Sequence, residues 1–322
     1  MLHHRLLVLA GLAIVAIQVP ISAQPQAFIT ALDGTVTVVD TATLRISRVE
    51  PVGREPSGIA IAGLSQRAYV TNQDDGTVTE LSTTGLRASR TFAVGLQPTS
   101  IAVSPDEMRF YVAHFGSQSL TVHDTATGRL LRRITLAEKP VGVVAATDRL
   151  YVSGFGNSTM IIDTATNTVT ATLNLAAGAG GGIALSPDGA TLYVASVARR
   201  QVSVIRTQSL TFGVPLRTGD APFGLALSPD GSRLWVTNQL SDSVSLIDTT
   251  NAATITTIAV GDKPTGVAVA PTGRQVWIAN QGSDSVSVID TTTNRVIATL
   301  SVGVAPIAFG KFIEPLPGPR KP

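Results

Sequence analysis

The sequence predicts an all-β protein built by repetition of one unit, and two observations support this prediction. An aromatic–aliphatic pair recurs every 40 to 42 residues, at Tyr69-Val70, Tyr111-Val112, Tyr151-Val152, Tyr193-Val194, Trp235-Val236 and Trp277-Ile278. Hydrophobic residues make up 44% of the 322 residues and charged residues 14%, against about 25% charged residues in an average soluble domain. A constant period of this length, in a chain rich in Val, Ile and Thr, is typical of a repeat made of strands.

Two further markers keep the same register as the aromatic pair. An Asp-Thr dipeptide begins at Asp40, Asp124, Asp163, Asp248 and Asp290. A Gly-x-x-Pro motif occupies residues 53–56, 95–98, 219–222, 261–264 and 303–306. The chain departs from the pattern at Ser82 and Arg206, which replace the Asp, and at residues 176–182, AAGAGGG, which replace Gly-x-x-Pro.

Each unit divides into four short strands. A small-residue strand such as GVAVA (266–270) is followed by a turn such as SPDG (228–231), whose Pro and Gly suit a type I turn. The second strand contains the aromatic pair, and the third alternates apolar and polar residues, as in SVSVID (285–290). In DTTTN (290–294) the Asp and Thr side chains can bond backbone amides, and the fourth strand follows. Four strands at this period match one blade of a β-propeller.

The ends of the repeat region predict how the ring closes. Six complete units run from about residue 52 to 301, while residues 27–49 lack a first strand and residues 302–313 supply only a first strand. The two fragments together make a seventh blade. We therefore predict a single seven-bladed β-propeller of four-stranded antiparallel blades over residues 24–313, closed by pairing of the N- and C-terminal strands. Residues 314–322, rich in proline, are predicted to be a disordered tail.

The first 23 residues are typical of a secretory signal peptide. His3, His4 and Arg5 precede a run of 12 apolar residues (6–17), and Ala23 ends a stretch with small residues suited to cleavage. The run is shorter than the roughly 20 residues that cross a bilayer. We expect a periplasmic or secreted chain with no membrane span after cleavage, a retained N-terminal anchor being the alternative. The absence of Cys excludes disulfides, thiol catalysis and Cys-ligated metal sites.

The repeat VGxxPxGIAxSPDGxxxYVTNxxxxSVSVIDTxTN resembles that of the YVTN β-propeller repeat family. Tyr69-Val70-Thr71-Asn72 spells the name, and the resemblance covers residues 27–313. It implies the propeller fold and says little about activity. The family and its neighbours include exported proteins of undefined role, surface-layer-like proteins and, more distantly, lactonase-type and cofactor-bearing propellers.

One face of the predicted propeller is expected to bind a ligand or partner. It collects the Gly-x-x-Pro loops and the loops between the second and third strands, which differ most from unit to unit, and loops of this kind commonly carry function. We call it the variable face, and the face with the SPDG and DTxT turns the turn face. The candidate lining residues are Arg54, Asn72, Asp75, His114, Lys139, Arg199, Asn238, Asp242, Lys263, Asn280 and Asp284.

A structural interpretation stands beside the functional one for most of these candidates. The three Asn residues end second strands, where Asn commonly stabilises a turn, and we favour that role. Asp75, Asp242 and Asp284 are expected to share one loop position, where a carboxylate ring could hold Ca²⁺; we favour loop capping, because the blades stand too far apart to share one ion. His114 occupies a place where other units carry Asn or Ser. With His123 in a strand, a two-His metal centre is not expected.

The function we predict is that of an exported, non-enzymatic, monomeric binding protein for a protein, glycan or small molecule, with no cofactor and no metal. The alternative is a lactonase-like hydrolase, with or without a divalent metal, at the channel mouth. No Gly-x-Ser-x-Gly or His-Glu-x-x-His motif is present. Nucleic acid is not expected as a partner, because 24 basic residues nearly balance 22 acidic ones. All four Tyr and both Trp occupy the repeated aromatic position, with Phe28 in the seventh unit, and are predicted to pack blade against blade.

Overall fold

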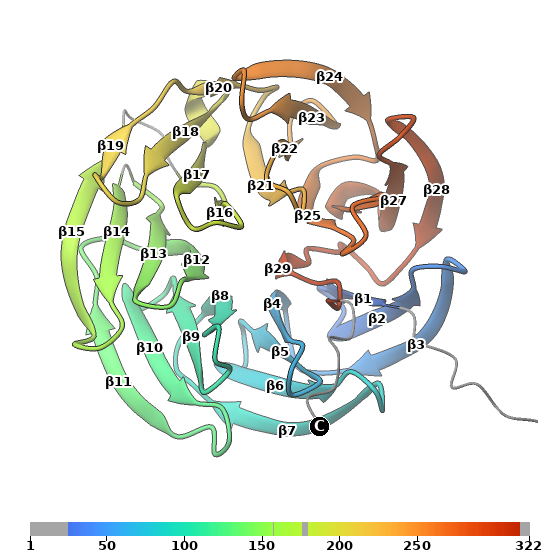
Figure 1. The fold of residues 1–322 in the computed structure, drawn as a ribbon. Coiled ribbons are helices and arrows are strands. Elements are labelled where there is room, and N and C mark those ends of the chain that lie inside the picture. Colours follow the sequence, from blue (N-terminus) through green and yellow to red (C-terminus); the bar gives the residue numbers. More distant parts are fainter. Residues whose placement is uncertain (1–24, 157, 176–179, 316–322) are drawn as a thin grey trace, which may run out of the picture.

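Seven sheets stand around a central axis in the computed structural model, which describes residues 25–156, 158–175 and 180–315 (Figure 1). The predicted seven-bladed β-propeller is thereby confirmed. The signal peptide predicted for residues 1–23 lies outside the described residues. None of the helices in the described part of the chain has the length and apolar character needed to cross a membrane.

Within a blade the strands follow one another from the axis to the rim (Figure 1). Blades 1 to 3 contain β1 (Gln26–Ala31), β2 (Thr35–Asp40) and β3 (Arg45–Pro51); β4 (Pro56–Ala62), β5 (Arg67–Asn72), β6 (Thr77–Ser82) and β7 (Arg87–Ala93); and β8 (Pro98–Val103), β9 (Arg109–His114), β10 (Ser119–Asp124) and β11 (Leu130–Thr135). Blades 4 and 5 contain β12 (Pro140–Ala145), β13 (Arg149–Gly154), β14 (Ser158–Asp163) and β15 (Thr168–Asn174); and β16 (Ile183–Leu185), β17 (Thr191–Ser196), β18 (Gln201–Arg206), β19 (Thr211–Phe212) and β20 (Leu216–Arg217). Blades 6 and 7 contain β21 (Pro222–Leu227), β22 (Arg233–Asn238), β23 (Ser243–Asp248) and β24 (Ala253–Ala259); and β25 (Pro264–Val269), β26 (Gln275–Asn280), β27 (Ser285–Asp290) and β28 (Arg295–Ser301). Two short 3₁₀ turns, η1 (Val197–Arg199) and η2 (Gln281–Ser283), and strand β29 (Phe309–Lys311) complete the described elements.

The repeated turns form as their residue types predict. In blade 7, Oδ1 of Asp290 accepts the backbone N–H groups of Thr292 (3.0 Å) and Thr293 (2.8 Å). In the SPDG turn of blade 6, Oδ1 of Asp230 accepts the N–H of Ser232 (3.0 Å), and Gly231 adopts φ +73°. Hydrogen bonds from Ser228 and Ser232 lower the pKa of Asp230 to about 2. These side chains accept the backbone N–H groups of their own turns. They recur in the repeat because they stabilise the turns, which is a structural role and not a ligand-binding one.

The core lies between blades, and the repeated aromatic position is its centre. Phe28, Tyr69, Tyr111, Tyr151, Tyr193, Trp235 and Trp277 are each 0–5% exposed. Trp235 of blade 6 packs with Val267 and Ile278 of blade 7, and the Tyr69 ring of blade 2 stacks on Phe110 of blade 3 at 5.2 Å. The predicted blade-to-blade packing of the aromatics is confirmed, and their burial is the main source of cohesion around the ring.

The C-terminal segment closes the ring by hydrogen bonding along β1. The N–H of Phe28 donates to the carbonyl of Phe312 (2.7 Å), and the N–H of Ile307 donates to the carbonyl of Thr30 (2.9 Å). The Thr30 hydroxyl accepts the N–H of Ala308 (2.8 Å). Two segments some 280 residues apart in sequence are therefore hydrogen-bonded side by side at the inner edge of blade 1.

The closing segment differs from a regular innermost strand. It meets β1 through two isolated bridges, and its short strand β29 pairs in parallel with β4 of blade 2 (Figure 1). The reason is backbone conformation: Ala305, Ala308 and Gly310 have φ of 48°, 44° and 124°, which interrupt an extended strand. The segment thus bridges blades 1 and 2 rather than belonging wholly to blade 1.

The predicted tail begins with two residues that the structure describes. Glu314 accepts the backbone N–H of Gln26 (3.0 Å) through its carboxylate, and Pro315 lies against Gly63 of blade 2. Burial raises the pKa of Glu314. Both residues therefore contact the propeller, and the remainder of the predicted tail, residues 316–322, lies outside the described residues.

Candidate functional site

The variable face is built from two loops per blade that are joined by backbone hydrogen bonds. In blades 2, 6 and 7 the loop after the second strand donates an N–H to the third residue of the Gly-x-x-Pro loop. These bonds run from Gln73 to Glu55 (3.0 Å), from Gln239 to Ala221 (3.0 Å) and from Gln281 to Lys263 (3.1 Å). Because each loop pair is fixed to its own blade, the face presents side chains from a rigid frame.

Three predicted lining residues lie inside the blades rather than on the face. Asn72, Asn238 and Asn280 are fully buried. The Asn280 amide donates to the hydroxyls of Ser285 (3.1 Å) and Ser287 (2.9 Å), and the other two Asn side chains bond hydroxyls at the same spacing. They brace the end of the second strand against the third. The favoured structural interpretation agrees with this placement, and we withdraw the three as direct ligand contacts.

The three loop aspartates do not share one position, contrary to expectation. Asp75 is the third residue after Asn72, whereas Asp242 and Asp284 are each the fourth residue after the preceding Asn. The latter two have left-handed backbones, with φ of 45° and 50°, as does Gly76 with φ 64°. Gly76 is therefore their counterpart. Counting residues from the buried Asn would have exposed the one-residue offset.

Each of these carboxylates caps a loop instead of joining a ring. Asp75 accepts the N–H of Arg54 (2.8 Å), Asp242 that of Lys263 (2.9 Å) and Asp284 that of Ala305 (2.8 Å). Asp75 also pairs with the Arg54 side chain, Nε to Oδ1, at 2.6 Å. Within residues 25–156, 158–175 and 180–315, no three His, Asp or Glu side chains cluster as a cation site requires. The metal-dependent form of the hydrolase alternative is accordingly not favoured.

His114 lies in the interior of blade 3, at the register position that Asn280 holds in blade 7. Its Nε2 lies 2.8 Å from the hydroxyl of Thr121, and Nε2 of His123 lies 2.9 Å from the same hydroxyl. Burial lowers the pKa of His114 to about 4 and also lowers that of His123. Sequence reasoning kept the two histidines apart. Thr121 and His123 alternate onto one side of a strand, which is the signal that could have joined them.

Lys139 belongs to an aromatic cluster on the variable face. Its Nζ lies 4.7 Å from the centre of the Phe115 ring, and Phe115 meets Phe155 edge to face at 5.4 Å. Phe155 is 61% exposed, and Leu96, in the neighbouring Gly-x-x-Pro loop, is 71% exposed. The cluster thus places a cation over an aromatic ring beside exposed apolar side chains, an arrangement whose chemistry suits a ligand with negative charge and an apolar group.

Charge divides the variable face into two sectors. The basic–aromatic sector, in blades 3 to 5, contains Leu96, Phe115, Arg133, Lys139, Phe155, Arg199 and Arg200. The acidic sector, in blades 6, 7, 1 and 2, contains Asp33, Glu55, Asp74, Asp75, Asp220, Asp242, Asp262 and Asp284, with the cations Arg54 and Lys263. Arg200 reaches across the boundary to pair with Asp220, and the one acid among the described loops of the basic–aromatic sector, Glu138, is held by the Ser158 hydroxyl.

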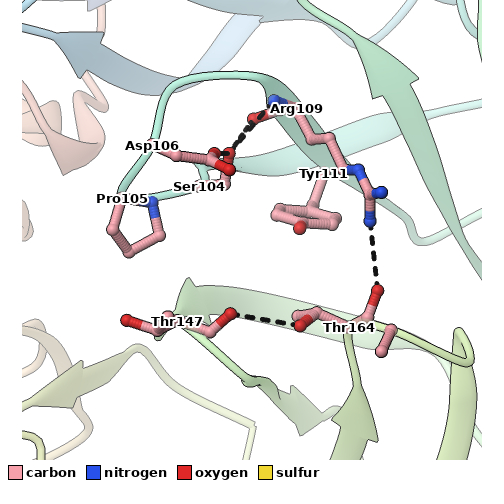
Figure 2. Close-up of a pocket in the computed structure, with 8 residues that line it drawn as sticks. Ser104, Pro105, Asp106, Arg109, Tyr111, Thr147 and Thr164 are labelled. Carbon is pink, nitrogen blue, oxygen red and sulfur yellow. Dashed lines mark hydrogen bonds between the residues drawn. The ribbon is translucent and has the colours of Figure 1, made fainter.

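The turn face carries a small hollow between blades 3 and 4. Figure 2 shows Arg109 crossing it, with Nη1 donating to the carbonyl of Thr164 (3.1 Å). The hollow measures about 200 Å³, below the roughly 300 Å³ at which ligand pockets begin. Arg149 and Arg233 reach the equivalent carbonyls of Thr207 and Thr291 in the next blades. The hollow is therefore a seam bridged by an arginine, not a binding site.

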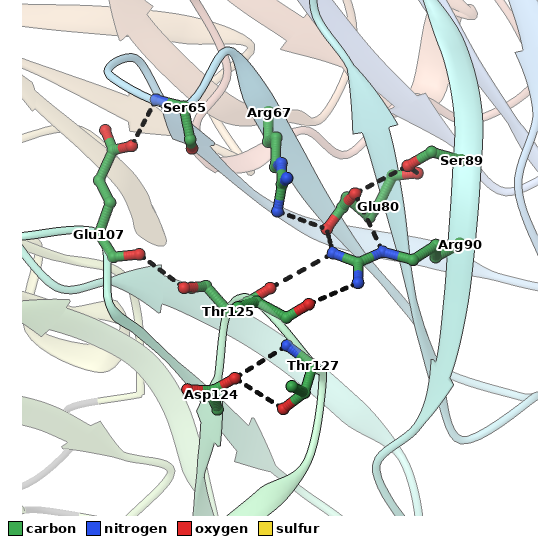
Figure 3. A network of polar contacts seen from close by, with 10 residues as sticks. Ser65, Arg67, Glu80, Ser89, Arg90, Glu107, Asp124, Thr125 and Thr127 are labelled. Atoms are coloured by element: carbon green, nitrogen blue, oxygen red, sulfur yellow. Dashed lines mark hydrogen bonds and ion pairs between the residues drawn. The ribbon is translucent and has the colours of Figure 1, made fainter.

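A buried ionic network in blade 2 escaped the sequence analysis. Glu80, 4% exposed, accepts Arg90 Nη2 (2.5 Å) and Arg67 Nη1 (3.4 Å). Arg90 also donates to the carbonyls of Thr125 (3.4 Å) and Ala126 (2.6 Å) in blade 3 (Figure 3). The available signal was an acid in a third-strand position where other units carry an aliphatic residue. Because Arg90 bonds Glu80 in blade 2 and two carbonyls in blade 3, the network ties the two blades together.

Comparison with known proteins identifies the class of fold. No family model matches the chain, and no curated protein matches its sequence. Among solved structures, a protein from Lactobacillus plantarum has a TM-score of 0.77 at 18% identity, over 88% of this chain and 98% of that one. Hydrazine synthase of Kuenenia stuttgartiensis has a TM-score of 0.73 at 19% identity, over 88% and 99%. The dihydro-heme d1 dehydrogenase NirN, in complex with DHE, has 0.65 at 18% identity, over 87% and 64%. The chain is a seven-bladed β-propeller, and at these identities the likeness shows the fold alone.

Proposed function

We propose that this propeller is an exported, non-enzymatic binding protein of the YVTN type that captures an acidic polypeptide segment through its basic–aromatic sector. The observation that carries the proposal is the Lys139–Phe115–Phe155 cluster, where a cation and exposed rings stand together. A few residues near the centre of an interface usually supply most of its binding energy, and aromatic residues are enriched at interfaces.

Charge complementarity supports an acidic partner. Lys139 and Arg133 are exposed on this sector, and the nearby Glu138 carboxylate is engaged by the backbone N–H of Gly156 (2.5 Å) and by Ser158. A segment with carboxylates and an apolar side chain would meet the cations and pack on Phe155 and Leu96. The acidic sector opposite would repel the same segment, which fixes its direction across the face.

Peptide display on the intact protein tests the proposal. Random peptides are selected on the full chain, and we expect enrichment of acidic sequences that contain an aromatic or aliphatic residue. Lys139→Ala and Phe155→Ala should each weaken a selected peptide about tenfold, and added NaCl should weaken it further. Selected peptides without acidic residues would overturn the choice of partner.

Matched controls come from the acidic sector of the same face. Lys263 stands at the same place in its Gly-x-x-Pro loop as Lys139 does before Pro140, and Leu240 is an exposed apolar loop residue like Phe155. Lys263→Ala and Leu240→Ala should leave peptide affinity unchanged. Equal losses of peptide affinity from both pairs of variants would place binding elsewhere.

N-terminal sequencing of the protein from a periplasmic extract tests export, with a mature chain beginning at Gln24 as the expected result.

A further inference from the structure

The two buried histidines of blade 3 share one hydroxyl in a chain of four polar contacts. Nδ1 of His114 lies 3.3 Å from the carbonyl oxygen of Leu96, and Nε2 of His114 lies 2.8 Å from the Thr121 hydroxyl. Nε2 of His123 lies 2.9 Å from that hydroxyl, and Nδ1 of His123 lies 3.1 Å from the carbonyl oxygen of Gly128. The three side chains are 0–1% exposed.

The neutral triad has one hydrogen too few for these contacts. Each contact needs a hydrogen between its two heavy atoms. A neutral imidazole supplies one N–H and a threonine supplies one O–H, so two neutral rings and Thr121 supply three hydrogens for four contacts. Carbonyl oxygens cannot donate. One contact must therefore lack its hydrogen until a further proton arrives.

We assign the missing hydrogen to the longest of the four contacts. Three contacts measure 2.8 to 3.1 Å, within the ordinary range of hydrogen bonds, and the contact to Leu96 is the longest at 3.3 Å. In the neutral triad His114 therefore donates from Nε2 to Thr121, Thr121 donates to Nε2 of His123, and His123 donates from Nδ1 to Gly128. The two rings hold opposite tautomers, and Nδ1 of His114 presents a lone pair to the Leu96 carbonyl.

We propose that His114, Thr121 and His123 form a buried site for one proton, which binds at Nδ1 of His114 and ties the Leu96 loop to blade 3. The proton supplies the missing hydrogen of the fourth contact. Leu96 lies in the Gly-x-x-Pro loop of the basic–aromatic sector, so proton uptake fixes part of that surface. The effect on partner binding rests on the proposed function; the proton site itself does not.

The surroundings limit the site to one proton. Burial lowers the pKa of both histidines, that of His114 to about 4, and the charge of Arg133, on β11 opposite Thr121, also lowers both. On the other side the His123 ring stacks on Phe110 at 4.8 Å. No carboxylate among the described residues raises either pKa. A second proton would stand beside the first and Arg133, without a fifth contact to receive it.

Imidazole nitrogen NMR of the full chain tests the proposal, with His3 and His4 replaced by Gln to leave two rings. At neutral pH we expect His114 as the Nε2–H tautomer and His123 as the Nδ1–H tautomer. On acidification one proton should appear, at Nδ1 of His114. The same tautomer in both rings at neutral pH, or uptake of two independent protons, would overturn the site.

Thr121 variants show whether the shared hydroxyl sets the tautomers. In Thr121→Val the His114 ring should change from Nε2–H to Nδ1–H and the His123 ring should stay Nδ1–H, so that each bonds its own carbonyl, while Thr121→Ser should keep the wild-type pattern. An unchanged His114 tautomer in Thr121→Val would contradict the proposal. If that variant does not fold, the wild-type spectrum alone tests the proposal. Because the carboxylates of the selected peptide also take up protons near pH 4, its affinity is compared between the wild type and Thr121→Val at the same acidic pH, and we expect the wild type to bind more tightly. A peptide that does not bind at all contradicts only the proposed function.

Discussion

Blades 3 and 7 place different chemistry in the same frame. Asn280 in blade 7 and His114 in blade 3 end the second strand, and each contacts the hydroxyl at the same place in the third strand, Ser287 or Thr121. The Asn280 amide has two fixed hydrogens and no titration near neutral pH. An imidazole has one hydrogen whose position depends on its partners. A single replacement thus turns a strand brace into a group that responds to protons, with the backbone register unchanged.

The largest effect is expected from opening the ring of blades that contains both blade 3 and blade 7. Deleting residues 302–315 removes the bonds from the C-terminal segment to β1 and exposes strand edges, so we expect unfolding or aggregation, measured by size-exclusion chromatography and circular dichroism. Deleting only residues 316–322 is the control. If the shortened chain stays folded, hydrogen exchange should quicken in blade 7, whose Thr265 bonds the carbonyl of Ile307 (3.1 Å), more than in blade 3. Wild-type melting would refute the composite blade.

The next effect compares the aromatic residues at one repeat position. Trp277→Ala in blade 7 should cost about 3–5 kcal/mol of unfolding free energy, because a large, fully buried side chain is lost. Tyr111→Ala in blade 3 should cost less, because the Tyr111 ring borders the hollow on the turn face. Urea unfolding of the two variants measures the difference. Equal losses of unfolding free energy would show that the hollow beside Tyr111 does not reduce the cost of removing its side chain.

A smaller effect separates the two blades by pH. The pKa of His114 is 6.5 in an ordinary setting and about 4 in the fold, so the unfolded chain binds the proton first as pH falls. Stability is full above pH 6.5 and declines until about pH 4, by about 3 kcal/mol for this residue. His114→Asn places in blade 3 the amide that blade 7 has at this position. In this variant the urea midpoint of unfolding should fall less steeply between pH 6.5 and about pH 4 than in the wild type. An unchanged slope would exclude His114 as its source.

The smallest effect concerns ions on the rim. Arg54→Ala removes an exposed ion pair with Asp75 and should leave the melting temperature unchanged, because solvent screens such pairs. Arg90→Ala, which strips a partner from the buried Glu80, should lower it clearly. Calorimetry of both variants provides the comparison. If Arg54→Ala lowered the melting temperature as much as Arg90→Ala, exposed ion pairs would contribute as much to stability as buried ones.

The fold was predictable because the same strand pattern recurs in each repeat, and each repeated residue type has a structural role within or next to its own blade. Asp290 caps its own turn, and Trp277 is one of the seven buried aromatic side chains at the repeated position. The site was less predictable, because it depends on departures from the repeat. That Asp75, Asp242 and Asp284 each accept a backbone N–H of a neighbouring loop, instead of forming a ring, depends on how the two loops approach each other in the fold. That His114 and His123 meet at Thr121 depends on how β9 pairs with β10, so the two-residue spacing of Thr121 and His123 reveals the contact only once that pairing is known.

Ring closure also dictates when this protein can fold during synthesis. Strand β1 is made early, yet its inner neighbour is made only when residues 302–314 leave the ribosome. Until then blade 1 has an open edge and its residues Phe28 and Thr30 have unmatched backbone groups. The native blade 1 can therefore be completed only once residues 302–314 have been made.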